Sequence, residues 1–302
     1  MNSTNTKEFE KLFHESLSDY VTAIAWSPKD TILAATSAAS EVALWDNGEL
    51  IMLETANDKG ESLDCVAFSC DGQFLAVGGQ DGRVKIWENY ELIATLDNPR
   101  TWVDKLAWNP DKNWLAYSVG RYIQVWDTKT REVIVTLNFE NSSPLGIHWR
   151  NDGQHLAIAG NKGIKIWNSQ DWDDEPYVLD MPTVSTAVAW SGDGNFLASA
   201  NFDRSITVLQ WGNPDPWVMR GFPGKIRHLA WSDITTSSGA PLLACSSVEG
   251  IVVWEKLEDD DEGWEARVLT NHVEIIQGIG FAPGSLLLAS GAVDGWLCLW
   301  NK

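Results

Sequence analysis

The feature of this sequence that most constrains its fold is a dipeptide that recurs seven times at nearly constant spacing. The copies are Leu33-Ala34, Leu75-Ala76, Leu115-Ala116, Leu156-Ala157, Leu197-Ala198, Leu243-Ala244 and Leu288-Ala289. Successive pairs lie 42, 40, 41, 41, 46 and 45 residues apart. A period of this length indicates an array of one supersecondary unit, because such units bury their apolar faces against their neighbours.

Each of the seven units has the same internal pattern. An aromatic residue and then a turn precede every Leu-Ala pair, and the aromatic residues are Trp26, Phe68, Trp108, Trp149, Trp190, Trp231 and Phe281. A second apolar run follows each pair, as in VKIW or IVVW, and most units end in a further apolar stretch such as LIATL (92–96). Four short strands in every 40 to 45 residues predict the blades of an all-β propeller.

At these motifs the chain resembles the WD-repeat propeller family. The stretches AFSCDGQFLAVGGQDGRVKIW (67–87) and LLLASGAVDGWLCLW (286–300) carry the resemblance, which extends over nearly the whole chain. It implies a seven-bladed β-propeller of four-stranded antiparallel blades. We expect a single domain (1–302) with blades at about 20–55, 62–97, 102–138, 143–181, 184–221, 225–270 and 275–302. In this family an N-terminal segment completes the last blade, which implies that residues 7–16 close the ring.

The family often braces each blade with a hydrogen-bonded network of histidine, serine or threonine, aspartate and tryptophan. Only blade 7 has the complete set, namely His272, Ser290, Asp294 and Trp300. The resemblance implies a structural role for these four residues. Since the other blades lack the full set, we expect apolar packing to carry more of their stability.

The net charge and the absence of targeting signals limit the kinds of function that we expect. The chain has 42 acidic and 22 basic residues, a net charge of −20, which disfavours direct binding to nucleic acid because phosphate backbones are repelled. The start, MNSTNTKEFEKLF, has no apolar signal-peptide region, and no apolar run reaches the roughly 20 residues of a membrane helix. The four cysteines form no CxxC pair. We therefore expect a cytoplasmic protein with no membrane partner.

Motifs of catalysis are missing from the sequence. It contains no P-loop, no HExxH and no GxSxG element. We therefore predict no catalytic residues, no metal, no cofactor and no enzymatic activity. An alternative stays open, in which the central channel binds a small ligand or catalyses a reaction through charged residues near its mouth, namely Asp64, Asp104, Lys225, Arg227 and His228.

Two acidic clusters, DWDDE (171–175) and EDDDEGWE (258–265), are expected between the third and fourth strands of blades 4 and 6. One interpretation is a solvated loop that only aids solubility. The other is an acidic platform that reads basic peptides, with tryptophans as anchors. Its residues would be Trp172, Asp173, Asp174, Asp259, Asp260, Asp261 and Trp264.

The stronger candidate surface lies where the chain enters the first strand of each blade, at positions that we call the rim. In the WD-repeat family these positions commonly contact partners. The stretch RTWVDKLAW (100–108) resembles a segment of the G-protein β subunit whose tryptophan helps to hold a GTPase subunit. Tryptophan and arginine are also favoured interface anchors. The predicted partner-binding residues are Trp102, Tyr20, Asp104, Asp64, Arg227, Lys225 and Phe202.

The leading prediction is thus a non-catalytic scaffold or adaptor that binds another protein through the rim. The kinds of partner that the sequence predicts are a GTPase and a basic peptide segment. Packing of Trp102 on its own loop is the alternative to partner contact, and the oligomeric state is left open.

Overall fold

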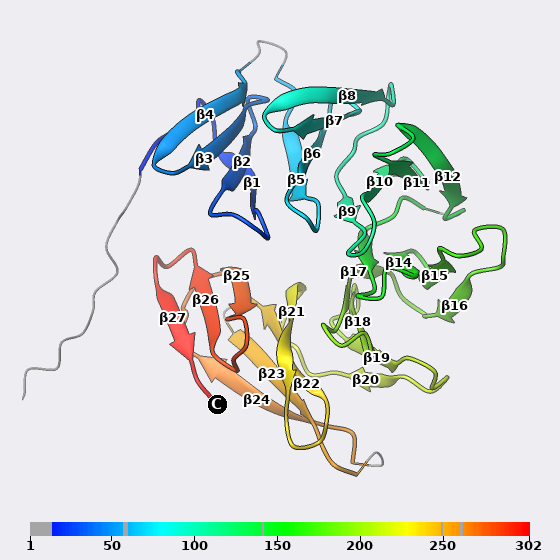
Figure 1. Cartoon of the computed structure of the whole chain (residues 1–302). Helices are drawn as coiled ribbons and strands as arrows, with labels where there is room; N and C mark the ends of the chain where they lie inside the picture. Colours follow the sequence, from blue (N-terminus) through cyan, green and yellow to red (C-terminus); the bar gives the residue numbers. More distant parts are fainter. Residues whose placement is uncertain (1–13, 57–59, 141, 249, 260–261) are drawn as a thin grey trace, which may run out of the picture. The chain divides into compact units, whose positions relative to one another are not determined.

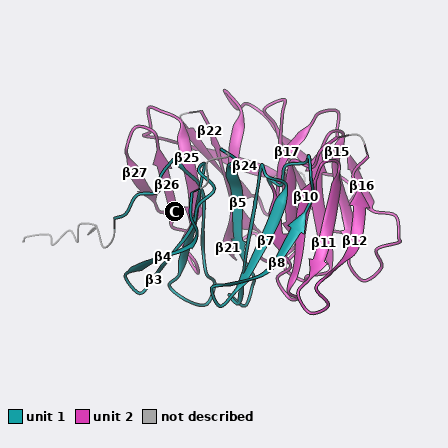
Figure 2. Cartoon of the chain, turned by 90° about the horizontal axis from the view of Figure 1, so that it is seen from above, with its two compact units in different colours: residues 1–104 teal, residues 105–302 magenta. Residues whose placement is uncertain are grey.

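A computed structural model describes residues 14–56, 60–140, 142–248, 250–259 and 262–302. The chain divides into two compact units, residues 1–104 and 105–302, coloured separately in Figure 2. Its described residues form seven antiparallel sheets in chain order, as the seven repeats predicted (Figure 1). We call these sheets blades 1 to 7. Among the described residues there is no helix of the length and apolarity that a membrane crossing requires.

The first unit contains blades 1 and 2, each a meander of four strands in sequence order. The strands of blade 1 are β1 (Val21–Trp26), β2 (Leu33–Ser37), β3 (Val42–Asp46) and β4 (Glu49–Glu54). Those of blade 2 are β5 (Leu63–Phe68), β6 (Phe74–Gly79), β7 (Arg83–Glu88) and β8 (Glu91–Asp97).

The second unit contains blades 3 to 7. Blade 3 comprises β9 (Leu106–Trp108), β10 (Trp114–Val119), β11 (Tyr122–Asp127) and β12 (Glu132–Asn138). Blade 4 comprises β13 (Gly146–Trp149), β14 (His155–Gly160), β15 (Gly163–Asn168) and β16 (Tyr177–Asp180). Blade 5 comprises β17 (Ser185–Trp190), β18 (Phe196–Asn201), β19 (Ile206–Gln210) and β20 (Trp217–Met219).

Blade 6 comprises β21 (Ile226–Thr235), β22 (Pro241–Ser247), β23 (Gly250–Lys256) and β24 (Trp264–Thr270). Blade 7 has three strands within the described residues, β25 (Ile276–Phe281), β26 (Leu288–Ala292) and β27 (Leu297–Trp300). Most of the predicted closing strand (7–16) lies outside the described residues. Residues 14–16, which are described, form no strand.

Identical turn chemistry joins the first two strands of blades 2 and 5. The hydroxyl of Ser69 donates to Asp71 at 2.6 Å and accepts the backbone N–H of Phe74 at 2.9 Å. Ser191 makes the same pair of bonds, with Asp193 at 2.5 Å and the N–H of Phe196 at 2.9 Å. A serine hydroxyl can mimic a backbone turn in this way, which is why the SCDG and SGDG sequences reverse the chain.

Aromatic residues of the first strands also join successive blades of the second unit. The indole N–H of Trp149 donates to the carbonyl of Ala107 at 3.1 Å, and that of Trp231 donates to Ala189 at 3.0 Å. Each bond links residues 42 positions apart, which is one repeat. The aromatic column therefore supplies both apolar packing and a polar link from one blade to the next.

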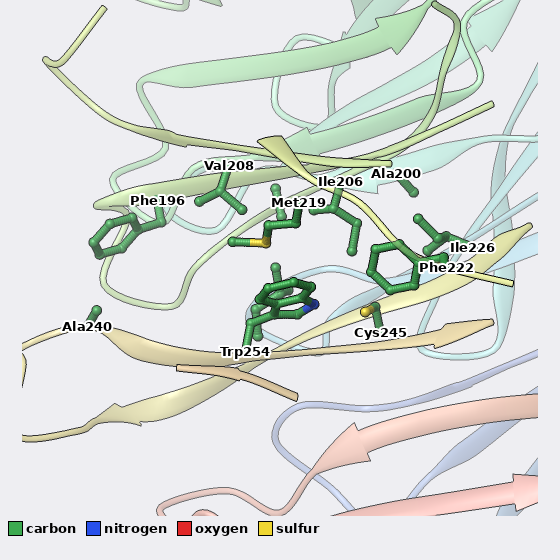
Figure 3. Packing of buried hydrophobic residues seen from close by; sticks show 12 residues of the cluster. Phe196, Ala200, Ile206, Val208, Met219, Phe222, Ile226, Ala240, Cys245 and Trp254 are labelled. Carbon is green, nitrogen blue, oxygen red and sulfur yellow. The ribbon is translucent and has the colours of Figure 1, made fainter. Parts of the chain in front are cut away.

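The core between blades 5 and 6 is shown in Figure 3. Strands β18 and β19 contribute Phe196, Ile206 and Val208, which pack with Trp254 of β23. Phe222 and Ile226, from the segment that leads into β21, lie in the same cluster (Figure 3). This segment is thus anchored in the core at two points, which matters for the surface described next.

Candidate functional site

Trp102, a rim residue of the first unit, lies in a segment whose backbone is fixed. Val103 is fully buried, and its N–H donates to the carbonyl of Gly79 at 3.0 Å. The hydroxyl of Thr101 donates to the carbonyl of Asn98 at 2.8 Å. Between these two residues, the side chain of Trp102 is left 65% exposed. It lies in no strand, because β9 begins only at Leu106.

Tyr20 is also exposed, at 69%, and lies directly before β1. The carboxylate of Asp64, on β5, accepts the hydroxyl of Ser62 at 2.7 Å, so this acid is partly engaged within its own blade. Asp104 is half-buried at the end of the first unit. The first unit therefore carries two exposed aromatic rim residues and two carboxylates.

The other predicted rim residues, Phe202, Lys225 and Arg227, belong to the second unit. Phe202 is 63% exposed at the turn between β18 and β19. The ammonium of Lys225 lies 5.9 Å from the centre of its ring, within the range of a cation–π contact. Arg227 is exposed two positions further along. The structure thus brings Phe202 and Lys225 together.

His228, which belongs to the channel alternative, is half-buried rather than open to solvent. Its Nδ1 lies 2.9 Å from the hydroxyl of Ser246. Burial, and then the positive charge of Arg227, lower the pKa of this imidazole below its ordinary value. The side chain is therefore neutral at physiological pH and bonded within its blade.

The acidic clusters differ from their expected form, because both tryptophans point inward. Trp172 packs against Trp114 and Trp149, with ring centres 6.3 and 6.1 Å away. Trp264 begins β24 rather than lying in the loop, and it packs among Phe196, Trp217 and Trp231. Large rings are favoured in the core because they remove much apolar area from water. Both indoles therefore pack against aromatic rings of their own unit.

Among the described residues of these clusters, two aspartates accept hydrogen bonds from nearby backbone N–H groups. Asp171 accepts the N–H of Asp173 at 3.2 Å, and Asp174 accepts the N–H of Glu175 at 3.0 Å. Asp259 lies in the turn after β23, while Asp260 and Asp261 are outside the described residues. In the described part of the chain, no group of three histidine, cysteine or acidic side chains is arranged to hold a metal ion.

The predicted bracing residues of blade 7 lie in one hydrogen-bonded chain. His272 Nδ1 is 3.2 Å from the carboxylate of Asp294, and its Nε2 is 2.8 Å from the hydroxyl of Ser290. That hydroxyl accepts the indole N–H of Trp300 at 2.9 Å. Burial opposes the charge on Asp294, but the N–H groups of Trp296 and Val273 and the bond to His272 outweigh it and lower the pKa of this carboxyl.

Blade 5 contains a second network that the sequence comparison between blades did not reveal. The buried amide of Asn201 accepts the hydroxyl of Ser199 at 2.8 Å and donates to Ser205 and Thr207 at 3.0 and 2.9 Å. Ser205 in turn donates to Asp203 at 2.5 Å. Blade 5 therefore has a polar network of its own, built from other residues than the family set. An asparagine flanked by serines was the available signal.

These features define the class of the protein, a repeat-built β-propeller that presents exposed aromatic side chains from fixed turns. The family model described as "WD domain, G-beta repeat" matches residues 8–46, 53–88, 90–127, 180–208 and 263–301, which is more than half of the chain. The chain belongs to this WD-repeat family.

Known proteins agree with this assignment. The chain is 26% identical to Protein HIR1 of Cryptococcus neoformans over 217 residues, covering 59% of this chain and 24% of that protein. It is 23% identical to Protein FIZZY-RELATED 3 of Arabidopsis thaliana over 294 residues, covering 93% of this chain and 58% of that protein. The chain therefore spans between 24% and 58% of the length of these relatives.

A solved structure shows the fold. One chain of the "Crystal Structure of Mitotic Checkpoint Complex" matches with a TM-score of 0.74 and 21% identity, covering 100% of this chain and 98% of that chain. The seven-bladed β-propeller predicted from the repeats is confirmed.

Proposed function

We propose that this protein is a non-catalytic scaffold or adaptor that binds another protein through its exposed rim residues, with Trp102 as the main anchor. The rim residues of the first unit, Tyr20, Asp64, Trp102 and Asp104, form the principal docking surface. No catalytic step is part of this function, and we propose a cytoplasmic location on the sequence grounds given above.

One observation carries the proposal. Trp102 exposes most of its indole although both neighbouring residues are fixed to blade 2, Val103 by burial and Thr101 by hydrogen bonds. Burial of an exposed tryptophan at an interface removes a large apolar area from water, and such residues are among the commonest binding hot spots. Because the backbone is already ordered, a partner that covers this ring loses little further conformational entropy.

The relatives support a role in assemblies. The solved structure that this chain matches is one chain of an assembly, the Mitotic Checkpoint Complex. The fold itself does not determine function, so the proposal depends on the exposed rim rather than on the propeller.

The test is affinity purification from native lysate with quantitative mass spectrometry. Wild type is compared with Trp102→Ala and with a control, Val268→Ala, which removes a side chain of equal exposure (64%) from the outer strand β24. We expect a stoichiometric protein that is retained by wild type and the control and lost from Trp102→Ala. Equal recovery with all three baits would contradict the proposal.

A further inference from the structure

A second surface, in the second unit, combines positive charge with an exposed aromatic ring. The turn between β18 and β19 lies against the segment 220–227 through three contacts. Lys225 lies over the ring of Phe202, Arg204 donates to the carbonyl of Pro223 at 3.2 Å, and Arg220 lies 3.7 Å from the carboxylate of Asp203. We call Phe202, Arg204, Arg220, Lys225 and Arg227 the basic patch.

The backbone under this patch is held in place. In the segment 222–227, the alternate residues Phe222, Gly224 and Ile226 are buried, which directs Lys225 and Arg227 outward. Gly224 exchanges two hydrogen bonds with the hydroxyl of Ser247, at 3.2 and 2.9 Å. A Cβ at Gly224 would lie 2.1 Å from the side chain of Val248, so the close approach requires glycine here.

The turn that presents Phe202 is equally well fixed. The N–H of Phe202 donates to the carbonyl of Val184 at 2.8 Å, and that of Arg204 donates to Asn201 at 3.1 Å. Arg204 adopts a left-handed backbone (φ 66°), which is uncommon for a non-glycine residue. The Asn201 network braces the turn from within the blade. The exposed ring and the guanidinium are therefore preorganised.

The charge of this surface is opposite to that of the chain as a whole. The net charge is −20, yet the stretch 202–227 contains four of the 22 basic residues and only two acids, Asp203 and Asp215. The bond of Asp203 to Arg220 is long and exposed, and such pairs contribute little. Arg227 and Lys225 make no ion pair with a carboxylate among the described residues.

We propose that the basic patch binds an acidic peptide segment of a partner protein, in which carboxylates face the cations and an apolar side chain covers Phe202. This inference rests on the proposed scaffold function and names the chemistry of one of its partners. A fixed cationic surface around an exposed ring suits such a segment because charge complementarity selects it and apolar burial adds affinity.

An acidic peptide is favoured over nucleic acid for a physical reason. A nucleic acid strand extends beyond four cations and would meet the negative potential of the remaining surface, whereas a short peptide ends within the patch. Binding of a nucleic acid is therefore an outcome of the test that would overturn the proposal.

The probe is an octapeptide with six carboxylates around a central leucine-phenylalanine pair, labelled with a neutral fluorophore and titrated by fluorescence anisotropy. The proteins are wild type, Phe202→Ala, and the double charge reversal Lys225→Glu/Arg227→Glu. The matched control is Lys129→Glu/Lys162→Glu, which makes the same change in net charge at exposed turns of blades 3 and 4. Circular dichroism verifies that each variant is folded.

We expect the reversal at Lys225 and Arg227 to weaken binding by about tenfold or more, and Phe202→Ala by about fivefold, with less than a twofold change in the control. Equal weakening by both double variants would show that net charge alone acts, and would overturn the proposal. Absence of binding to wild type, or stronger binding of a single-stranded oligonucleotide or of the lysine version of the peptide, would also overturn it. If the partner that depends on Trp102 is still recovered with the reversed variant, the scaffold function stands whatever happens to this proposal.

Discussion

Trp102 and Phe202 are both exposed aromatic residues at rim positions, but they are held and surrounded differently. Trp102 is fixed through the backbone of its neighbours and has the carboxylates Asp64 and Asp104 in its own unit. Phe202 follows the buried Asn201 network and has the ammonium of Lys225 near its ring. One repeat architecture thus holds two exposed aromatic residues in different ways, and one of the two rings, that of Phe202, lies beside a cation.

The largest expected effect comes from removal of the indole at position 102. Trp102→Ala should lower the affinity for the partner that binds the first unit by about 30-fold or more. Truncation of a hot-spot tryptophan costs about 2 kcal/mol or more of binding free energy. Phe202→Ala should leave that complex within about twofold. Surface plasmon resonance with the purified partner measures both, and equal losses would mean that the two aromatic residues serve one site.

The second largest expected effect is a difference in salt dependence between binding at the two surfaces. Raising the salt concentration from about 50 to about 500 mM shortens the Debye length to a few ångströms. The affinity of the basic patch for the acidic peptide should therefore fall by about tenfold. The complex that depends on Trp102 should change by less than about threefold, since burial of an aromatic ring is not screened. Titration of each complex at three salt concentrations gives the dependence of its affinity on salt. Equal salt dependence of the two complexes would contradict the expected electrostatic difference between the two surfaces.

The Asn201 network beside Phe202 should contribute more to the stability of the fold than the Thr101–Asn98 hydrogen bond beside Trp102. Asn201→Ala leaves buried hydroxyl partners unsatisfied, for which we expect a loss of about 1–3 kcal/mol in the free energy of unfolding. Chemical denaturation provides the measurement. A loss below about 0.5 kcal/mol would show that the network is not needed to hold blade 5.

The smallest expected effect is that of Thr101→Ala, the matched change beside Trp102. It removes a half-buried hydroxyl that donates to Asn98, and a single such bond contributes about 0.5–1.5 kcal/mol. Since Val103 still fixes the segment, partner affinity should fall by less than about threefold. A loss as large as that of Trp102→Ala would indicate that the hydrogen bond, and not the buried valine, positions the indole.

The seven-bladed fold could be predicted because the Leu-Ala pairs and aromatic columns repeat in every unit, so that each copy reinforces the others. The set His272, Ser290, Asp294 and Trp300 could be named because its spacing within blade 7 resembles the family. The packing of Trp172 and Trp264 was not predictable, because the clusters were read from their charge and nothing in the sequence indicated that β24 begins at Trp264.

The basic patch was only partly predictable for a related reason. Lys225 and Arg227 were named from their rim positions, whereas Arg204 and Arg220 join them through contacts of a turn and a connecting segment. The left-handed turn of Arg204 recurs in other blades, at Ser40, Gly82 and Gly295. Those positions have no basic side chain, so the repeat pattern does not specify this contact.

The most direct test of the scaffold account is site-specific photocrosslinking in living cells, with a photoreactive phenylalanine derivative placed at position 102, 202 or 268. The account predicts a discrete protein adduct from position 102 that is the same protein lost from Trp102→Ala, a different adduct or none from position 202, and none from the outer-strand position 268. Adducts of equal yield from positions 102 and 268, or no adduct from position 102, would contradict it.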